Sequence, residues 1–410
     1  MMNRFLWLSA FSLLLIVGFF TGCSKPSISE EERLEYYELN RQNSLRMFKP
    51  FMYNTSEGEQ KELFKMVHVS DVHISPWSNS NNIQNPYNLK EAVRFANDTA
   101  ARINAMVATG DYISNHDKTS RAEAIVYLNT FTNALYYNNN TPTFTSTGNH
   151  DVNMLNPDYA TNAFSKTDIF NLLTSKINYK IDSDGQVNHY YADLVNPMGG
   201  IIRIITLDVT DQENFVYSAQ HNAILSQKQI DWLCHTALKK EMTEHHSVII
   251  LIHHPLPPDE DEEFKRVIYN AYLYDWNMIP EIIESFRTKQ TLTKKYKNKL
   301  NVSDSISVNV SFDNAPGEFI CYLGGHLHTY LNYEVKSATE STLPKQIMII
   351  ANNMSPSEKN EISSIERNSV GLRNNTFNLY AIDTKEKMIY VTFFGATSFY
   401  YPSIIALPYL

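Results

Sequence analysis

Short apolar runs alternate with helical stretches over most of the chain. Mostly apolar runs that predict buried strands occur at residues 64–69, 105–108, 142–146, 201–207, 247–252 and 319–323. Helical spacing of apolar residues predicts helices at 88–103 and 121–136, and a further one around Trp232. The chain after residue 319 is rich in strands, with others expected at 346–351, 379–382 and 388–394. Alternation of this kind favours a largely parallel or mixed sheet covered by helices.

The first 22 residues have a different pattern. Arg4 precedes an almost uninterrupted apolar run at residues 5–20, which is shorter than the ~20 residues that span a bilayer and is typical of the apolar part of a signal peptide. The run ends in Thr21-Gly22-Cys23, which resembles a bacterial lipobox, where small residues allow cleavage and the thiol then receives a diacylglycerol. We therefore predict a lipoprotein signal peptide at 1–22 and lipidation of Cys23. The alternative is an ordinary signal peptide or an uncleaved anchor.

The rest of the chain is predicted to form a tether and one large domain. Residues 23–62 are polar and charged, and they suggest a lipid-anchored tether with a lead-in helix that opens near Glu30. Residues 63–410 are long enough to bury one large α/β core. Within them, an insertion at about 256–318 carries the acidic run 259–263 and several aromatic residues. It is interpreted either as a lid over the site or as a surface insertion packed on the domain.

The net charge and the cysteine content exclude some classes of function and of site. The formal net charge is −9, with 35 Lys and Arg against 44 Asp and Glu, so no nucleic-acid-binding surface of clustered cations is expected. A small phosphorylated substrate is still possible, because bound metal ions would dominate the local field. After Cys23, only Cys234 and Cys321 remain, and they form neither a disulfide framework nor a zinc-ligand spacing. The expected location is the cell envelope, on the periplasmic or outer-surface side.

Five polar motifs follow the predicted strands. They are Asp71-Val72-His73, Gly110-Asp111, Gly148-Asn149-His150-Asp151, His253-His254-Pro255 and Gly324-Gly325-His326-Leu327-His328. Together they offer carboxylate and amide oxygens and several imidazoles, a mixture that suits Mn, Fe or Zn and lacks the thiolates of a structural zinc site. The strand ends should bring them to one edge. Because alternate residues of an extended chain point the same way, Asp71 and His73 should face one pocket, as should His326 and His328.

In this order the motifs resemble those of the calcineurin-like metallophosphoesterase family, which run D-x-H, G-D, G-N-H-[DE], H and G-H-x-H. The resemblance covers about residues 63–395. It implies a four-layer αββα sandwich of two mixed sheets flanked by helices, with two divalent metal ions at the sheet edge. By the family pattern, one ion would be held by Asp71, His73 and His328, the other by Asn149, His253 and His326, and Asp111 would bridge both.

The resemblance also implies a reaction. A hydroxide activated by the two ions would attack phosphorus and hydrolyse a phosphate ester. His150 would protonate the leaving oxygen or stabilise the transition state, since the pKa of imidazole lies near working pH. Asp151 would either orient His150 or cap a turn. His254 would lie behind the ligands and orient one of them or the substrate.

One position separates this chain from two familiar branches of the family. Purple acid phosphatases have a tyrosine ligand three residues after the bridging aspartate, and Ser/Thr protein phosphatases have an aspartate there, but this chain has Ser114. The remaining resemblance is to the broad bacterial set that includes cyclic-nucleotide and glycerophosphodiester phosphodiesterases. We therefore expect a phosphodiester substrate, with a phosphomonoester as the alternative. The rival from another class is a non-catalytic binding lipoprotein that keeps the fold.

Overall fold

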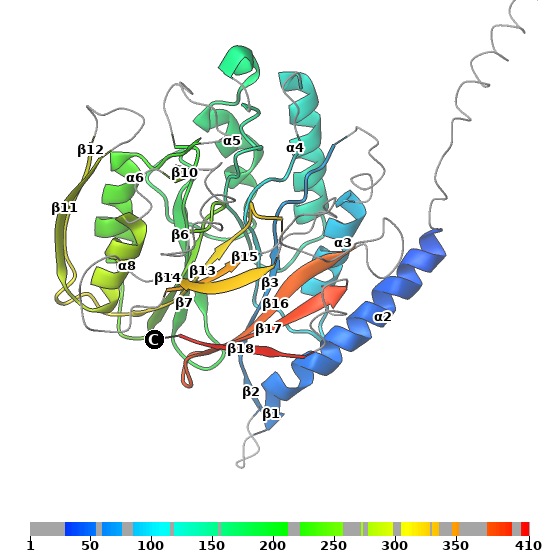
Figure 1. Cartoon of the computed structure of the whole chain (residues 1–410). Helices are drawn as coiled ribbons and strands as arrows, with labels where there is room; N and C mark the ends of the chain where they lie inside the picture. Colours follow the sequence, from blue (N-terminus) through cyan, green and yellow to red (C-terminus); the bar gives the residue numbers. More distant parts are fainter. Residues whose placement is uncertain are drawn as a thin grey trace, which may run out of the picture.

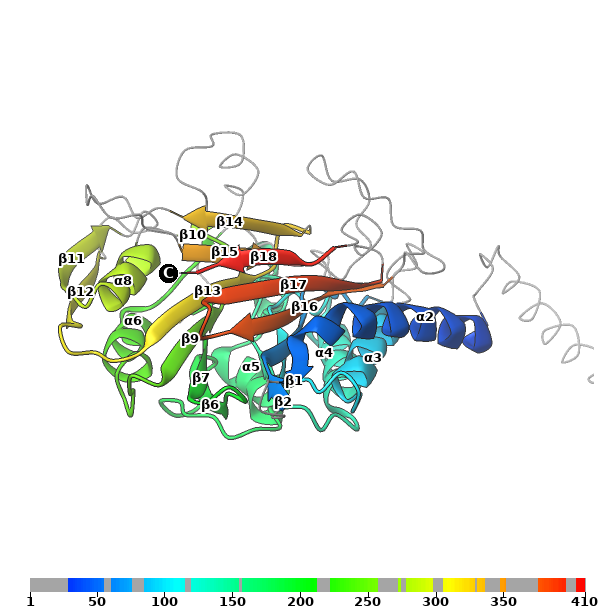
Figure 2. The ribbon, with the colours of Figure 1, turned by 90° about the horizontal axis from the view of Figure 1, so that it is seen from below.

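The structure is a computed structural model, and two six-stranded sheets that lie face to face form its centre (Figure 1). Helices cover the outer face of each sheet, as the view from below shows (Figure 2). The described residues are 29–54, 60–75, 85–114, 119–154, 157–211, 222–256, 272–273, 278–297, 305–328, 330–335, 347–351, 375–395 and 403–409. Among them, no helix combines the length and the apolar character needed to cross a membrane.

The first sheet has the strand order β18-β17-β16-β3-β4-β5. Its strands are β3 (Phe64–Val69), β4 (Ala105–Ala108), β5 (Thr143–Thr145), β16 (Thr376–Asp383), β17 (Met388–Gly395) and β18 (Ile405–Pro408). β3, β4 and β5 are parallel, whereas β16, β17 and β18 join them as an antiparallel extension. The carboxyl ends of β3, β4 and β5 therefore meet at one edge, and three of the polar motifs follow these strands.

The second sheet has the order β14-β15-β13-β9-β7-β6. Its strands are β6 (Tyr190–Val195), β7 (Ile201–Thr206), β9 (His246–Leu251), β13 (Glu318–Gly324), β14 (Leu331–Val335) and β15 (Ile347–Ala351). β7, β9, β13 and β15 are parallel, and the edge strands β6 and β14 are antiparallel to their neighbours. The two remaining motifs follow β9 and β13, so this sheet contributes the other side of the site.

Three apolar cores separate the four layers. In β9, Ile249 and Leu251 face the core between the sheets, while Val248 and Ile250 face the outer helices. β3 alternates in the same way, with Met66 in the central core and with Val67 and Val69 in the outer core. Strands buried on both faces lack a polar side, which explains their nearly continuous apolar sequences. The predicted αββα sandwich of two mixed sheets is confirmed.

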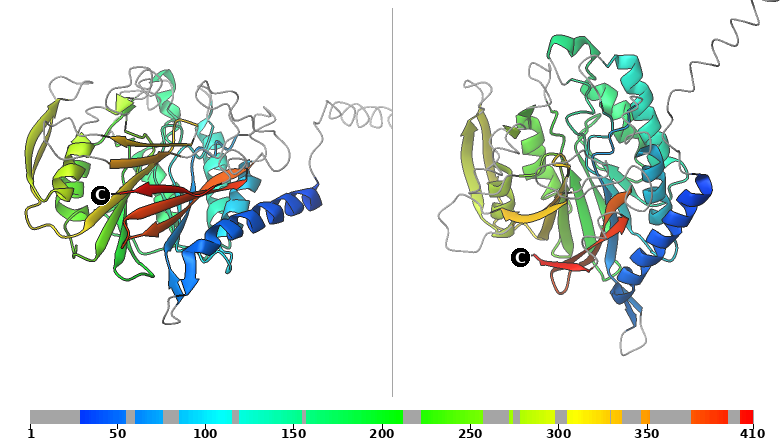
Figure 3. Two further views of the ribbon diagram at one scale, coloured as in Figure 1. Left: turned by 60° about the horizontal axis from the view of Figure 1, so that its bottom comes forward. Right: turned by 45° about the vertical axis from the view of Figure 1, so that its right-hand side comes forward.

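The outer layers consist of helices and one hairpin (Figure 3). The first sheet is covered by α2 (Glu30–Phe48), α3 (Asn85–Ala96), α4 (Arg121–Tyr136) and α5 (Lys166–Leu172). The second is covered by α6 (Gln227–Trp232), the π-helix η5 (Leu233–Ala237), α8 (Met278–Arg287) and the hairpin of β11 (Thr291–Lys297) and β12 (Ser305–Ser311). The bounds of α4 agree with the predicted helix at 121–136, and Ser120 begins it with a reciprocal capping box with Glu123.

The segment predicted as a tether packs on the domain from residue 30 onward. Ser29 caps α2, and this helix buries Tyr37 and Phe48 in the first outer core. The chain then passes through η1 (Lys49–Phe51) and the hairpin of β1 (Met52–Asn54) and β2 (Gln60–Glu62) before it enters β3. α2 is mostly polar, but Tyr37 and Phe48 lie on the face that meets the domain, whereas Leu34 and Leu39 are exposed.

Part of the predicted insertion at about 256–318 belongs to the outer layer. α8 buries Ile279, Ile282, Ile283 and Phe286, a spacing that places one apolar face on the second sheet. The hairpin of β11 and β12 adds Tyr296 and Val308 to the same core. The acidic run 259–263 and the aromatic residues Phe264 and Tyr269 lie outside the described residues, so the lid interpretation stays a prediction.

Candidate metal centre

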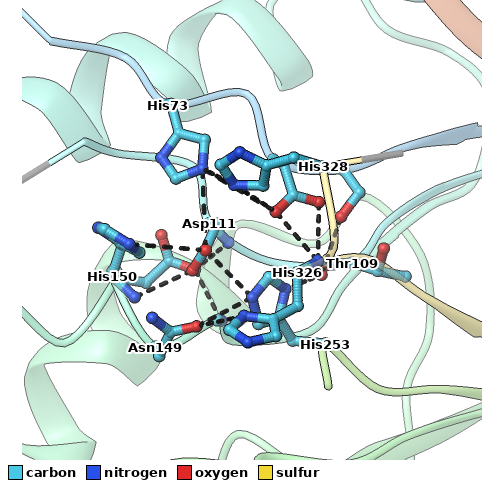
Figure 4. A network of polar contacts seen from close by, with 12 residues as sticks. His73, Thr109, Asp111, Asn149, His150, His253, His326 and His328 are labelled. Atoms are coloured by element: carbon cyan, nitrogen blue, oxygen red, sulfur yellow. Dashed lines mark hydrogen bonds and ion pairs between the residues drawn. The ribbon is translucent and has the colours of Figure 1, made fainter. Parts of the chain in front are cut away.

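The five polar motifs meet at the edge where β3, β4, β5, β9 and β13 end (Figure 4). All seven predicted ligands lie there, and each comes from the loop after a strand. Asp71 and Asp111 are almost completely buried, as are Asn149 and His253. Buried carboxylates and imidazoles need partners or ions to offset the loss of hydration, so this concentration of polar groups indicates a binding site.

One group of donor atoms comprises Asp71, His73, Asp111 and His328, whose ligand atoms lie within 4.8 Å of one another. His328 Nε2 is 3.4 Å from Asp71 Oδ1, and it is 2.9 Å from His73 Nε2. His73 Nε2 also lies 3.8 Å from Asp111 Oδ2. Two carboxylates and two imidazoles that converge in this way could hold a divalent metal ion.

A second group lies on the other side of Asp111. His253 Nε2 is 3.1 Å from Asp111 Oδ2 and 3.1 Å from Asn149 Oδ1, and His326 Nδ1 is 3.0 Å from the same amide oxygen. Donor atoms bound at right angles to one first-row ion lie about 3.0 Å apart, because each metal–ligand bond is about 2.1 Å. The separations fit such an ion, and Asp111 Oδ2 faces both groups.

Electrostatics also favour a cation in the second group. His253 Nδ1 donates to the Thr109 carbonyl oxygen at 2.6 Å, which directs Nε2 toward two oxygen acceptors. Burial alone would lower the pKa of His253, but the Asp111 carboxylate raises it to about 9. Burial would likewise raise the pKa of Asp111, but His253 and His150 hold it well below its ordinary value. The position between these side chains therefore attracts positive charge.

The other imidazoles are held in the neutral form that binds metals. Burial, with the nearby His253 as a further cause, lowers the pKa of His326 to about 3. Burial and the neighbouring His328 lower the pKa of His73 far below its usual range. A neutral imidazole presents a nitrogen lone pair, so these surroundings suit ligands rather than cations.

The ligand loops are not extended, which corrects the geometric argument made from the sequence. Asp71, His73, Asp111, His326 and His328 all have positive φ, between 50° and 70°. Residues other than glycine rarely adopt this left-handed region, and each such residue costs on the order of 1 kcal/mol or more. The paired residues do converge, but tight turns bring them together rather than the alternation of a strand.

Two glycines allow these turns to pack closely. Gly110 has φ of 90°, and a Cβ there would lie 2.6 Å from His253 Nδ1 and 2.7 Å from the Gly148 backbone. A Cβ on Gly148 would lie 2.2 Å from the Asp111 nitrogen. No side chain fits at either position, so both glycines are needed to bring the β4 and β5 loops into contact.

Asp151 holds the Asp111 loop in place. Its Oδ2 accepts hydrogen bonds from the backbone N–H groups of Asp111 and Gly148 at 3.0 and 2.8 Å. Its Oδ1 accepts one from Tyr112 at 2.7 Å. The sequence left two roles for Asp151, and these contacts favour the capping of a turn over the orientation of His150. We therefore treat Asp151 as a positioning residue rather than a catalytic one.

His150 lies at the rim of the site. Its backbone N–H donates to Asp111 Oδ1 at 2.9 Å, and its Nε2 is 3.9 Å from Asp111 Oδ2. The ring packs edge-on against His73, with centroids 4.9 Å apart, and its side chain is 21% exposed. His150 thus borders both the donor atoms and the solvent, as a group that contacts a bound substrate must.

His254 lies behind the second group. It is buried, and its ring stacks on His326 with centroids 4.1 Å apart. One ring nitrogen of His254 lies within 4.8 Å of one nitrogen each of His253 and His326, a group that could hold a metal ion, yet neither nitrogen of His254 has a hydrogen-bond partner within the described structure. Its contact with His326 is therefore one of packing, and the predicted orienting role stays a prediction.

The sequence did not point to two backbone groups that shape the site. The Thr109 carbonyl fixes His253, and the His326 N–H donates to both oxygens of Asp71 at 3.0 Å. Backbone groups occur at every residue, so no sequence signal distinguishes these two. Tyr112, which directly follows Asp111, is directed away from the site: it stacks on Phe131, and its hydroxyl donates to Ser146 O at 2.6 Å.

Comparison with known proteins agrees with this geometry. Residues 64–330 match the sequence profile of the calcineurin-like phosphoesterase family, and this range contains all seven predicted ligands together with His150 and Asp151. No curated individual protein matches the chain. Members of this family use divalent metals, as the Asp71, His73, Asp111 and His328 group would allow. Because the matched range spans more than half of the chain, the protein belongs to the calcineurin-like phosphoesterase family.

Proposed function

We propose that this phosphoesterase uses two divalent ions, drawn from Mn, Fe and Zn, and that phosphodiesters are its preferred substrates. The observation that carries the proposal is the position of Asp111 Oδ2, which faces His73 Nε2 at 3.8 Å on one side and His253 Nε2 at 3.1 Å on the other. One carboxylate shared by two groups of nitrogen and oxygen donors is what a dinuclear site requires.

The donor set suits these ions. Asp71, His73 and His328 would hold one ion and Asn149, His253 and His326 the other, with Asp111 between them. When bound, the ions supply the Lewis acidity that activates a water molecule and neutralises phosphoryl oxygens. The absence of thiolates within this group fits a catalytic rather than a structural site.

The chain's own contribution to catalysis centres on His150. Its ring borders solvent and lies 3.9 Å from Asp111 Oδ2, so it can meet the leaving group of an ester bound over the donor atoms. We assign it the transfer of a proton to the leaving oxygen, for which an imidazole is suited. Asp151 supports this step indirectly, because it fixes the loop whose aspartate accepts the His150 N–H.

The test uses two soluble esters with the same leaving group. The purified protein, loaded with Mn²⁺, is incubated with p-nitrophenyl phosphate and with bis(p-nitrophenyl) phosphate. We expect turnover of both, with a higher kcat/KM for the diester. A higher value for the monoester would show a phosphatase. No turnover of either ester by protein shown to contain metal would overturn the proposal and favour a binding protein.

The proposal extends to the N-terminus. Thr21-Gly22-Cys23 ends the apolar run and resembles a lipobox, so we assign Cys23 as the acylated residue of a lipoprotein in the cell envelope. Its partners would be the membrane, through the lipid, and a small phosphorylated substrate. Mass spectrometry of the protein purified from a bacterial membrane tests this, because cleavage before Cys23 with an added diacylglycerol is expected, and a chain without it contradicts the assignment.

A further inference from the structure

The start of the N-terminal helix α2 and the catalytic edge lie at the same end of the molecule. α2 runs away from Ser29, the β1–β2 hairpin reverses the chain, and β3 returns to end at Val69, two residues before Asp71 (Figure 1). α3 runs back again before β4, so its first residues also lie at this end. The point where the described chain begins is therefore on the side of the ligand loops.

α2 is fixed to the domain rather than loosely attached. Phe48 packs against Phe95 with ring centroids 6.4 Å apart, and Tyr37 packs against Phe394 at 5.7 Å. Arg41 forms an ion pair with Asp98 from the α3–β4 connection. Because α2 cannot swing, the position of its first residue fixes where the preceding chain leaves the protein.

The distance from that residue to the lipidation site is short. From Cys23 to Ser29 is 29 − 23 = 6 residues, and six residues reach at most about 20 Å. An acylated Cys23 would therefore keep the start of α2, and with it the catalytic edge, close to the lipid surface.

The surface at this end has a composition that suits a lipid interface. We define the N-terminal patch as Arg33, Leu34, Tyr87 and Lys90. Leu34 is 48% exposed and Tyr87 is 51% exposed. Two cations lie near the Tyr87 ring, with Arg33 Cζ at 4.4 Å and Lys90 Nζ at 5.7 Å from its centroid. An amphipathic aromatic ring flanked by basic side chains is typical of the water–lipid boundary.

Acidic residues near the N-terminal patch determine which lipid headgroups the patch can contact. Glu30, Glu31 and Glu35 are exposed on the same turns of α2 as Arg33. They outnumber Arg33 and Lys90, so an anionic surface would repel this end of the protein. A zwitterionic surface carries no such penalty, and it accepts the exposed Leu34 and Tyr87 side chains.

We propose that the N-terminal patch rests on a zwitterionic lipid surface, and that the catalytic edge thereby faces the membrane and hydrolyses phosphate esters borne by lipids. This inference rests on the lipidation of Cys23 and on the phosphoesterase activity proposed above. It adds an orientation and a substrate class to them. Single exposed apolar residues are common on protein surfaces. We assign Leu34 and Tyr87 a role in membrane contact because they lie at the end of the molecule where the lipid would be attached.

The orientation is tested with the full lipoprotein in phosphatidylcholine vesicles that contain a headgroup spin label. A fluorophore is attached at Glu31→Cys or, as the control, at Glu386→Cys, which lies in the turn after β16 at the opposite end of β3. Cys234 and Cys321 are buried and stay unlabelled. Strong quenching at position 31 and little at 386 is expected. Equal quenching at both positions would overturn the proposal.

The substrate class is tested in the same vesicles with a phosphatidyl ester of p-nitrophenol. The variant Leu34→Glu with Tyr87→Glu should hydrolyse this ester slower by on the order of fivefold to tenfold, because two apolar side chains no longer favour the interface. Its rate on soluble bis(p-nitrophenyl) phosphate should not change. Leu39→Glu, on another face of α2 and 45% exposed, is the matched control and should leave both rates unchanged.

The outcomes separate the three claims. If the wild-type protein does not hydrolyse soluble bis(p-nitrophenyl) phosphate, the proposed phosphoesterase activity itself is contradicted. A wild-type chain that lacks the acyl group would remove the basis of the orientation. The third outcome is full activity on the soluble ester together with equal rates on the vesicle-borne ester for the wild type and for Leu34→Glu with Tyr87→Glu. It would contradict only the proposed orientation and lipid substrate.

Discussion

The two groups of donor atoms in the metal centre have similar ligands but differ in burial. We call Asp71, His73 and His328 the first side and Asn149, His253 and His326 the second side, with Asp111 between them. The His328 side chain on the first side is 33% exposed, whereas that of His253 on the second side is fully buried. The Thr109 carbonyl also fixes the ring of His253. A ligand held in place and excluded from water keeps its metal better than one at the surface. For the proposed dinuclear site we therefore expect an inner ion on the second side that stays bound, and an outer ion on the first side that is open to exchange and to substrate.

Asp111→Asn should have the largest effect, because this residue belongs to both sides. The substitution keeps the shape of the side chain but removes the shared charge, so we expect metal content to fall at both positions. The rate on bis(p-nitrophenyl) phosphate should fall by about a thousandfold or more. Metal analysis by mass spectrometry and steady-state kinetics check this. A variant that kept two ions and full rate would remove the basis of the comparison.

Matched substitutions on the two sides come next. His328→Gln should weaken the outer ion by about tenfold to a hundredfold, and excess Mn²⁺ should restore much of the rate. His253→Gln should not be restored in this way, because it also removes the 2.6 Å hydrogen bond to the buried Thr109 carbonyl oxygen and leaves that oxygen the longer one from Ser70 Oγ, at 3.2 Å. Metal titrations monitored by activity measure both effects. Equal rescue of the two variants would show that burial does not distinguish the sides.

Asp151→Asn should loosen the loop that both sides share. The amide would direct N–H groups at backbone donors that the carboxylate now accepts from. We expect a loss of about 1–3 kcal/mol in the free energy of unfolding, together with weaker metal binding and a lower kcat. Urea unfolding and metal titration measure these. If Asp151 instead acted on the proton of His150, the pH profile would shift while stability stayed unchanged.

His68, three residues before Asp71, should make the stability of the protein depend on pH. It is buried in β3 and hydrogen-bonded to Tyr380 and Thr109 at 2.8 Å, and burial lowers its pKa to about 3. Because the folded-state pKa lies below the unfolded value of ~6.5, its contribution to stability is complete above that pH and is lost as the pH falls toward 3.

Lowering the pH from 6.5 to 5 should therefore reduce the free energy of unfolding of the wild-type protein by about 2 kcal/mol through His68 alone. His68→Gln should remove that part of the pH dependence. Urea unfolding of the metal-free proteins at both pH values gives the difference. An unchanged pH dependence in the variant would show that His68 does not titrate in this way.

His254→Phe should have the smallest effect. Phenylalanine keeps the stacking on His326, and the imidazole nitrogens have no hydrogen-bond partner in the described structure. We therefore expect a change in stability below about 1 kcal/mol and nearly unchanged metal affinity. A loss of metal affinity comparable to that of His253→Gln would show that His254 orients a ligand of the inner ion, as the sequence had suggested, or that it binds this ion itself.

Local signals in the sequence predicted several strands and helices, whereas the four layers and the ligand set were expected from the resemblance to the family. The apolar run of β3 and the helical spacing of α4 are local signals, and the motifs after successive strands had to meet at one edge. β6 and α5 were not predicted, because a short amphipathic strand and a helix of 7 residues leave little periodicity to detect.

The geometry inside the site was beyond reach of the sequence. The left-handed turns at Asp71 and His326 depend on neighbours that are distant in sequence, such as the contact of Gly325 with Ser70. The two roles that the sequence left open for Asp151 could be weighed against each other only from the contacts of its carboxylate with the Asp111 loop. Residue types reveal which ligands are available, whereas tertiary contacts decide how each one is held.

The most direct test of the account is a metal titration of the metal-free protein. Mn²⁺ is added in steps, and bound metal and the rate on bis(p-nitrophenyl) phosphate are measured on the same samples. We predict two ions per chain, with tight binding of the first and with activity that appears as the second, weaker ion binds. Full activity with one ion per chain, or in the presence of a chelator that removes both, would contradict the dinuclear site.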